Sequence, residues 1–127
     1  MSASLDRLME SHPLAALGVD VAYFGRMPRR PADYHRLVAP ARTTACVYVL
    51  LGHGDRVLYV GKAYNPAARF DKHRRKWWWG EVRDVAILYV RGETRWHAGV
   101  SALHVETVAI HLLDPAYNVA QKAAIRG

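Results

Sequence analysis

Two short runs of strand-forming residues, separated by a four-residue turn, set the main constraint on how this chain can fold. The runs are Cys46–Leu51 and Val57–Val60, and the residues between them include Gly52-His53-Gly54-Asp55. Glycine and aspartate are typical of the tight turns that join antiparallel strands. The segment therefore predicts a β-hairpin in the middle of the chain.

The segments that follow the hairpin predict a small α+β domain. Asn65-Pro66 indicates a helix start, because asparagine caps helices and proline is favoured at the first helical position. We expect this helix to run to about Lys76, a third strand over Val82–Val90, and a long helix over Val100–Leu113. The order strand, strand, helix, strand, helix predicts a three-stranded antiparallel sheet flanked by helices.

Residues 1–44 are expected to form an N-terminal appendage, partly helical and partly irregular, before a domain that spans residues 45–127. Ser4–Ser11 carries leucines at helical spacing, and Val19–Phe24 alternates in the manner of a short strand. The stretch from Arg26 to Pro40 contains three prolines, which break regular structure.

The charge of the chain favours a polyanionic partner. Its 127 residues include 18 Lys and Arg against 11 Asp and Glu, which gives a net charge of +7. Two segments carry most of this excess, with six cations and one acid over residues 62–76 and five cations and one acid over residues 26–42. Nucleic acid, above all DNA, is the expected partner, although charge that only maintains solubility is the simpler alternative. The cations assigned to this interface are Lys72, Arg74, Arg75, Lys76, Arg29 and Arg30.

Other classes of protein are disfavoured by composition. The longest apolar run, Ala45–Leu51, is far shorter than the roughly 20 residues of a membrane span, so no membrane association is expected. Cys46 is the single cysteine, which excludes a disulfide scaffold and a zinc site built on several thiolates. A cytoplasmic location is therefore expected.

Two tyrosines are expected to converge on one face of the hairpin. A hairpin closed around His53-Gly54 places Tyr48 directly opposite Tyr59, and opposed side chains lie with their Cβ atoms about 5 Å apart. An aromatic pair that only stabilises the hairpin is the simpler interpretation. Gly61 and Lys62 lie two and three residues after Tyr59 and favour a polar site, because the glycine allows close backbone approach and the lysine adds a cation.

Three further polar residues point to the same site. Arg69 and His73 lie four residues apart on the predicted helix after the hairpin and so share one face. Glu106 lies in an otherwise apolar stripe of the last helix, where a carboxylate is costly unless it meets a cation or a metal. A structural ion pair with Arg69 or Lys62 is the alternative for Glu106.

Taken in order, these residues resemble the motifs of the GIY-YIG nuclease superfamily. Val47-Tyr48-Val49 stands where the first motif would be, with Cys46 in place of its glycine, and Tyr59-Val60-Gly61 stands for the second. The resemblance covers about residues 45–120, and the ordered set is more specific than either tripeptide. The polar positions that carry it are Tyr48, Tyr59, Lys62, Arg69, His73, Glu106 and Asn118.

The resemblance implies a divalent-metal-dependent endonuclease that hydrolyses phosphodiester bonds of DNA and leaves 5′-phosphate and 3′-hydroxyl ends. Arg69 would donate to the scissile phosphate, and Glu106 would hold one Mg²⁺ or Mn²⁺ that stabilises the leaving 3′ oxygen. Tyr48 or Tyr59 would be the general base, with its pKa lowered by nearby cations. His73 would support proton transfer or orient a tyrosine.

The resemblance assigns supporting roles to two further residues and leaves other interpretations open. Lys62 would add a cation beside the phenols, and Asn118 would fix the geometry around the site. A non-catalytic nucleic-acid-binding module on the same scaffold is the main alternative, and a regulatory subunit that contacts an acidic protein is a third. A double-strand break would require a homodimer or two sequential events, and sequence specificity would require dimerisation, structure-selective recognition or a protein partner.

The run Trp77-Trp78-Trp79 carries a separate expectation. Packing in the core is the simpler interpretation of three tryptophans. Three consecutive residues cannot all face one way, so at least one ring is expected to be exposed. An exposed tryptophan beside the basic segment would be able to stack on a nucleic-acid base.

Overall fold

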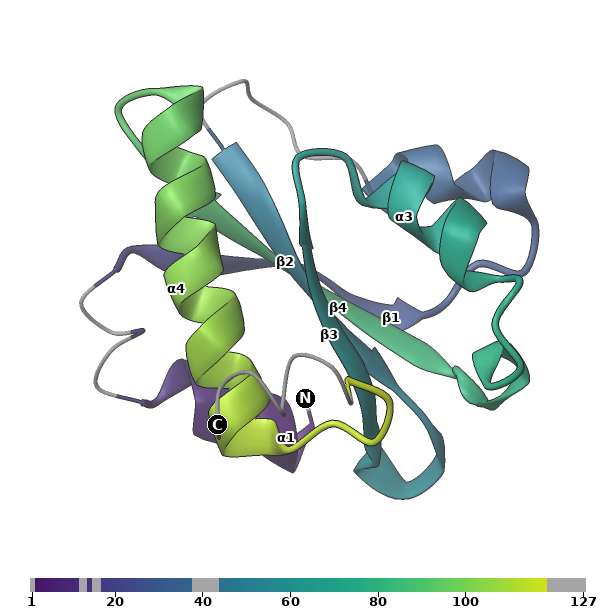
Figure 1. Cartoon of the computed structure of the whole chain (residues 1–127). Coiled ribbons are helices and arrows are strands. Elements are labelled where there is room, and N and C mark those ends of the chain that lie inside the picture. The colour runs from purple at the N-terminus through teal and green to yellow at the C-terminus, as the bar shows by residue number, and fades with distance from the viewer. Residues whose placement is uncertain (1, 12–13, 15–16, 38–43, 119–127) are drawn as a thin grey trace.

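The computed structural model describes residues 2–11, 14, 17–37 and 44–118 of the chain (Figure 1). Within these residues the strands are β1 (Val19–Arg26), β2 (Thr44–Leu51), β3 (Val57–Ala63) and β4 (Asp84–Arg91). The α-helices are α1 (Ala3–Met9), α3 (Pro66–His73) and α4 (Arg95–Leu113). Short 3-10 helices, labelled η1 to η3, cover Pro31–Leu37, His53–Asp55 and Trp79–Glu81.

The strands form one antiparallel sheet in the order β1-β4-β2-β3. The α+β class is confirmed, but the predicted three-stranded sheet is wrong, because β1 pairs along β4 as a fourth strand. Val19 and Val21 alternate with exposed residues, which is the pattern of an edge strand covered on one face. Residues expected to form an appendage therefore supply a strand to the same sheet.

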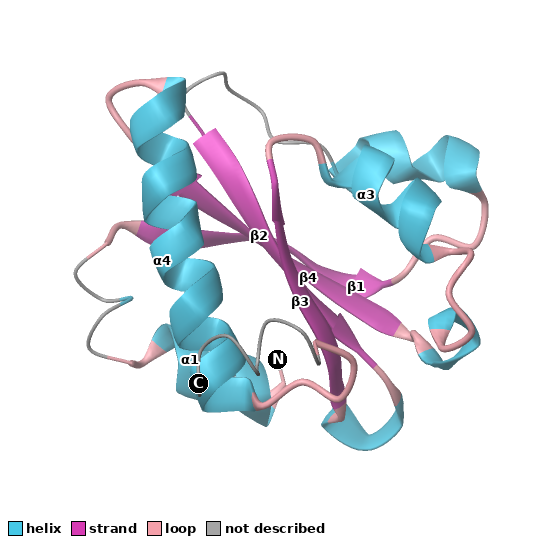
Figure 2. Cartoon of the chain, viewed as in Figure 1, coloured by secondary structure: helices cyan, strands magenta, loops and turns pink. Residues whose placement is uncertain are grey.

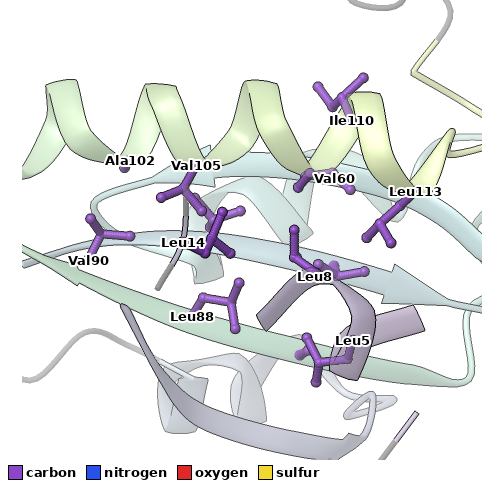
Figure 3. Packing of buried hydrophobic residues seen from close by; sticks show 14 of the residues in the cluster. Leu5, Leu8, Leu14, Val60, Leu88, Val90, Ala102, Val105, Ile110 and Leu113 are labelled. Atoms are coloured by element: carbon purple, nitrogen blue, oxygen red, sulfur yellow. The ribbon is translucent and has the colours of Figure 1, made fainter. Parts of the chain in front are cut away.

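Helices cover both faces of the sheet, so the fold has three layers (Figure 2). On one face α4 packs through Val105 and Leu113, and α1 adds Leu5 and Leu8 to the same apolar cluster (Figure 3). On the other face α3 and η1 cover a second cluster, in which Tyr34 packs edge-on against Phe70. Strand β2 lies between the two clusters and is buried along its whole length.

The helix boundaries differ from the predicted ones where capping decides them. Helix α3 begins after Asn65 as predicted, with the Asn65 side chain accepting from the Ala67 amide, but it ends at His73. Helix α4 begins five residues before the predicted start, because the Thr94 hydroxyl accepts from the backbone amide of His97. No helix in the described part of the chain is long and apolar enough to cross a membrane.

The hairpin has a wider loop than predicted, and this changes its register. The Gly52 amide donates to the Arg56 carbonyl at 2.8 Å, and the register shifts between Leu50 and Leu51. Tyr48 therefore lies opposite Gly61, so the predicted direct pairing of Tyr48 with Tyr59 is wrong. Gly61 lies two residues after Tyr59, and side chains two residues apart on a strand point to the same face. The Tyr48 and Tyr59 side chains therefore stay on the same face of the sheet.

Gly61 allows the Tyr48 ring to lie across strand β3. A Cβ atom built at Gly61 would collide with the Cζ and Oη atoms of Tyr48 and would lie 2.7 Å from its Cε2. Glycine is therefore the residue that fits under this ring. Since β3 is an edge strand, the phenol of the buried Tyr48 reaches the border of the sheet.

We predict that Gly61→Ala lowers the free energy of unfolding by about 1–3 kcal/mol, because the added methyl must displace the Tyr48 ring. Gly80→Ala is the matched control, since a Cβ at Gly80 meets no atom within 4 Å among the described residues. Urea denaturation of both variants measures the difference. Equal stability of the two variants would show that the close packing of Tyr48 on Gly61 is absent in solution.

Candidate active site

A tyrosine and a histidine form the buried part of the candidate site. Tyr48 projects from β2 and is 1 % exposed, and its hydroxyl lies 2.7 Å from Nε2 of His73, at the end of α3. The Tyr59 ring stacks beside Tyr48 with centroids 6.2 Å apart, and lies 4.6 Å from the imidazole of His73. The structure therefore brings together both predicted tyrosines and the predicted histidine.

Burial decides the protonation of this pair. Desolvation is the main cause that raises the pKa of Tyr48, with Tyr59 and Glu106 adding to it and Arg69 opposing it. Desolvation, together with the nearby positive charges of Arg69 and Lys76, lowers the pKa of His73 to about 4. At neutral pH the phenol is protonated and the imidazole is neutral, and in the tautomer that carries its proton on Nδ1 the Tyr48 hydroxyl donates to Nε2 of His73.

Glu106 reaches the same edge of the sheet from α4. Its side chain is half-buried, and desolvation raises the pKa of the carboxyl while Lys62 and Arg69 lower it. Within the described residues, no ion pair of 4.0 Å or less joins Glu106 to either cation. The structural ion pair considered as an alternative is therefore not formed, and the carboxylate keeps its oxygens for another cation.

The donor set at Glu106 fits only a metal that keeps most of its water. Among residues 2–11, 14, 17–37 and 44–118, no three His, Cys, Asp or Glu side chains gather in a way that could hold a metal ion. Glu106 would therefore be the single protein carboxylate. Mg²⁺ is commonly held by one or two carboxylates together with waters and substrate phosphate oxygens, so a hard divalent ion of this kind fits the residue present.

Asn118 holds the backbone of the edge strand rather than facing the phenols. Its Oδ1 accepts from the Val60 amide and its Nδ2 donates to the Val60 carbonyl, both at 2.8 Å, and the side chain is fully buried. Both polar atoms of the Asn118 side chain are therefore bonded to Val60 of β3, the residue between Tyr59 and Gly61. Asn118 therefore ties the backbone of β3 in place at Val60.

The three tryptophans divide between core and surface. Trp78 is buried and its ring stacks on Tyr59 and on Tyr117, with centroids 5.5 and 5.3 Å apart. Trp79 packs near Phe70, whereas Trp77 is 80 % exposed. The run thus extends the aromatic layer behind the site and leaves one ring in solvent. Sequence reasoning missed Tyr117, which carries no motif of its own.

The predicted nucleic-acid-binding cations lie on the surface around α3. Arg29 and Arg74 both act on the hydroxyl of Tyr34, which shows that the two basic segments come together beside η1. Two of the six are partly neutralised, because Arg74 pairs with Asp71 at 2.8 Å and Arg30 pairs with Asp33 at 3.3 Å. All six side chains are exposed: Lys72, Arg74, Arg75, Lys76, Arg29 and Arg30.

A cleft of about 380 Å³ adjoins the candidate site between α3 and α4. Lys62 and Arg69 line it, and both also act on the carboxyl of Glu106. Sequence reasoning missed two other lining residues, Tyr64 and Arg95. Arg95 precedes the predicted helix start at Val100, so the sequence pattern gives no signal for its position at the start of α4.

Protonation of His73 should make the fold sensitive to acid. The folded-state pKa lies near 4 and the ordinary value near 6.5, so the unfolded state binds the proton more readily. The stabilisation is complete above about pH 6.5 and is lost as pH falls toward 4, by an amount on the order of 2 kcal/mol.

We predict that His73→Gln flattens this part of the profile of unfolding free energy against pH. His104→Gln, at an exposed histidine of α4, serves as the control and should keep the slope of the original protein. Denaturation at a series of pH values from 4 to 7 measures both. A His73→Gln profile parallel to that of the original protein would contradict a buried, neutral imidazole.

Comparisons of the chain with protein-family models, with curated proteins and with solved structures found no match. The function of the chain must therefore be sought in the residues of its candidate site. These are the buried Tyr48–His73 pair, the cations Lys62 and Arg69, and the carboxylate of Glu106, gathered around the edge strand β3.

Proposed function

We propose that the chain is a divalent-metal-dependent endonuclease that hydrolyses phosphodiester bonds of DNA and leaves 5′-phosphate and 3′-hydroxyl ends. One observation carries the proposal. The Tyr48 hydroxyl of β2 lies 2.7 Å from Nε2 of His73 on α3, and the charges of Arg69 on α3 and of Glu106 on α4 both influence the pKa of that hydroxyl. A cation for the phosphate, an oxygen ligand for a metal and a proton-transfer group thus meet at one edge.

The charged residues of the site fit an anionic substrate. Arg69 is exposed on α3, where its guanidinium can donate two hydrogen bonds to the oxygens of a phosphodiester. Lys62 adds a second cation from β3. A Mg²⁺ or Mn²⁺ ion held by Glu106 would supply Lewis-acid stabilisation of the leaving 3′ oxygen.

The buried pair supports Tyr48, rather than Tyr59, as the proton acceptor. Because burial keeps the phenol protonated, Tyr48 can take a proton from the attacking water only if it passes its own proton on. In the tautomer that carries its proton on Nδ1, Nε2 of His73 lies 2.7 Å away and can receive it. The water oxygen then bonds to phosphorus, the bond to the 3′ oxygen breaks, and the leaving oxygen takes a proton from solvent.

A non-catalytic nucleic-acid-binding module remains the second candidate, because the exposed cations around α3 would serve binding alone. Glu106 favours the enzyme. A half-buried carboxylate beside a phosphate site repels the ligand unless a cation lies between them, so binding alone gives no reason to keep it there.

We predict that the protein nicks supercoiled plasmid in the presence of Mg²⁺ or Mn²⁺, and that Glu106→Gln lowers the rate about 100-fold or more. The substitution keeps the size of the side chain and removes the charge that would hold the metal. Glu93→Gln, at an exposed acid just before α4, is the matched control and should nick at the original rate.

Two results of this experiment would contradict the proposal. Nicking that persists in EDTA would show that no divalent ion is needed. Absence of nicking on plasmid, flap and junction substrates, together with salt-sensitive DNA binding, would favour the non-catalytic module.

We predict that Tyr48→Phe lowers the single-turnover rate of cleavage about 100-fold or more, because it removes the proton path to His73. Tyr59→Phe keeps the ring between His73 and Trp78 and should lower the rate less than tenfold. Rates measured with saturating protein separate the two tyrosines. A larger loss in Tyr59→Phe would assign the base to Tyr59, and near-normal rates in both variants would rule out a phenol.

A further inference from the structure

We infer that the cleft between α3 and α4 is a second phosphate-binding subsite, in which Arg95 and Lys72 hold a phosphate next to the one at Arg69 on the same nucleic-acid strand. The inference rests on the proposed function for the identity of the strand. It adds a binding site and two residues, Arg95 and Tyr64, that carry no part of the family resemblance.

The charges that line the cleft are all positive. Lys62, Arg69, Lys72 and Arg95 are its ionisable cations, and no carboxylate lines it among the described residues. None of the four forms an ion pair of 4.0 Å or less in the described part of the chain, unlike Arg30 and Arg74 nearby. Four unpaired cations around one hollow repel one another, so an anion that enters relieves this repulsion.

Arg95 is held in place before any ligand arrives. Its guanidinium lies 4.3 Å from the centroid of the Tyr64 ring, in a cation–π contact. The Tyr64 hydroxyl donates to the backbone carbonyl of Arg95 at 3.0 Å, so one side chain positions both the backbone and the charge. A guanidinium ordered in this way loses less conformational entropy when it binds an anion.

A glycine inside α4 makes room for this arrangement. A Cβ atom built at Gly99 would collide with the hydroxyl oxygen of Tyr64. Glycine within a helix costs about 1 kcal/mol relative to alanine, so its presence here is unfavourable for the helix itself. The close approach of Tyr64 to α4, which holds Arg95 at the cleft, accounts for it.

The cleft continues into the candidate active site. Lys62 and Arg69 line the cleft and also act on Glu106, so the two regions share two side chains. A polynucleotide carries one negative charge per nucleotide along its backbone. A strand with one phosphate at Arg69 would therefore bring a neighbouring phosphate into the cleft that Lys72 and Arg95 also line.

The test is the binding of a fluorescent single-stranded oligonucleotide, measured by anisotropy in EDTA over a series of salt concentrations. Arg95→Gln should weaken binding about tenfold and lower the slope of log affinity against log salt by about 0.7, the value for one lost phosphate contact. Arg7→Gln is the charge-matched control, because Arg7 bonds to the Leu112 carbonyl at the opposite end of α4. It should change neither quantity.

Tyr64 is tested as a positioning residue. Tyr64→Ala removes the ring under Arg95 and should weaken binding about as much as Arg95→Gln. The double variant should bind no more weakly than Arg95→Gln alone. Tyr64→Phe keeps the cation–π contact and should restore most of the affinity. Thermal unfolding of each variant separates a loss of binding from a loss of fold.

The outcomes distinguish this inference from the proposed nuclease activity. Arg95-dependent binding supports the subsite whether or not the protein nicks plasmid. Nicking with an unchanged affinity and salt slope in Arg95→Gln would overturn the subsite and leave the nuclease standing. Equal binding of polyglutamate of the same charge, with the same dependence on Arg95, would overturn the assignment to phosphate.

Discussion

The close approach of the Tyr48 ring to the backbone of Gly61 is the constraint on which the candidate site depends. A side chain at position 61 of the edge strand β3 would keep the Tyr48 ring on the α3 face of the sheet. The ring would then lie away from the residues of α4 on the other face. Without a Cβ at this position, the phenol extends over the strand to the border of the sheet. There it enters the electrostatic field of Glu106, which belongs to the opposite layer.

The same burial that places the phenol also sets its chemistry. A tyrosine so deep in the protein cannot hold a negative charge cheaply, and a histidine beside it cannot hold a positive one. The two neutral groups are therefore joined by a hydrogen bond that can move a proton without either carrying a charge in the resting state. The charged residues, Lys62, Arg69 and Glu106, lie further out, where solvent and an anionic ligand can reach them.

Structural features that depend on local residue types were predicted from the sequence, whereas features that depend on packing between distant residues were missed. The hairpin, the start of α3 at Asn65-Pro66, and the common face of Tyr48 and Tyr59 followed from turn residues, capping and strand alternation. The register failed because the width of the loop before Arg56 depends on backbone angles that residue type does not fix. A short strand over Val19–Phe24 was expected, but its place in the sheet was missed because β1 pairs with β4, which is distant in the sequence. The contact of Arg95 with Tyr64 was missed for a similar reason, since it joins the loop after β3 to the start of α4.

The most direct test of the account is the chemistry of the ends that the protein leaves. Plasmid nicked by the protein with Mg²⁺ would be treated with a DNA ligase, which joins only a 5′-phosphate to a 3′-hydroxyl. Ligation should then restore closed circles in full. Nicks that ligase cannot seal, or closed plasmid that stays intact with either metal ion, would contradict a metal-dependent hydrolysis that releases the 3′ oxygen.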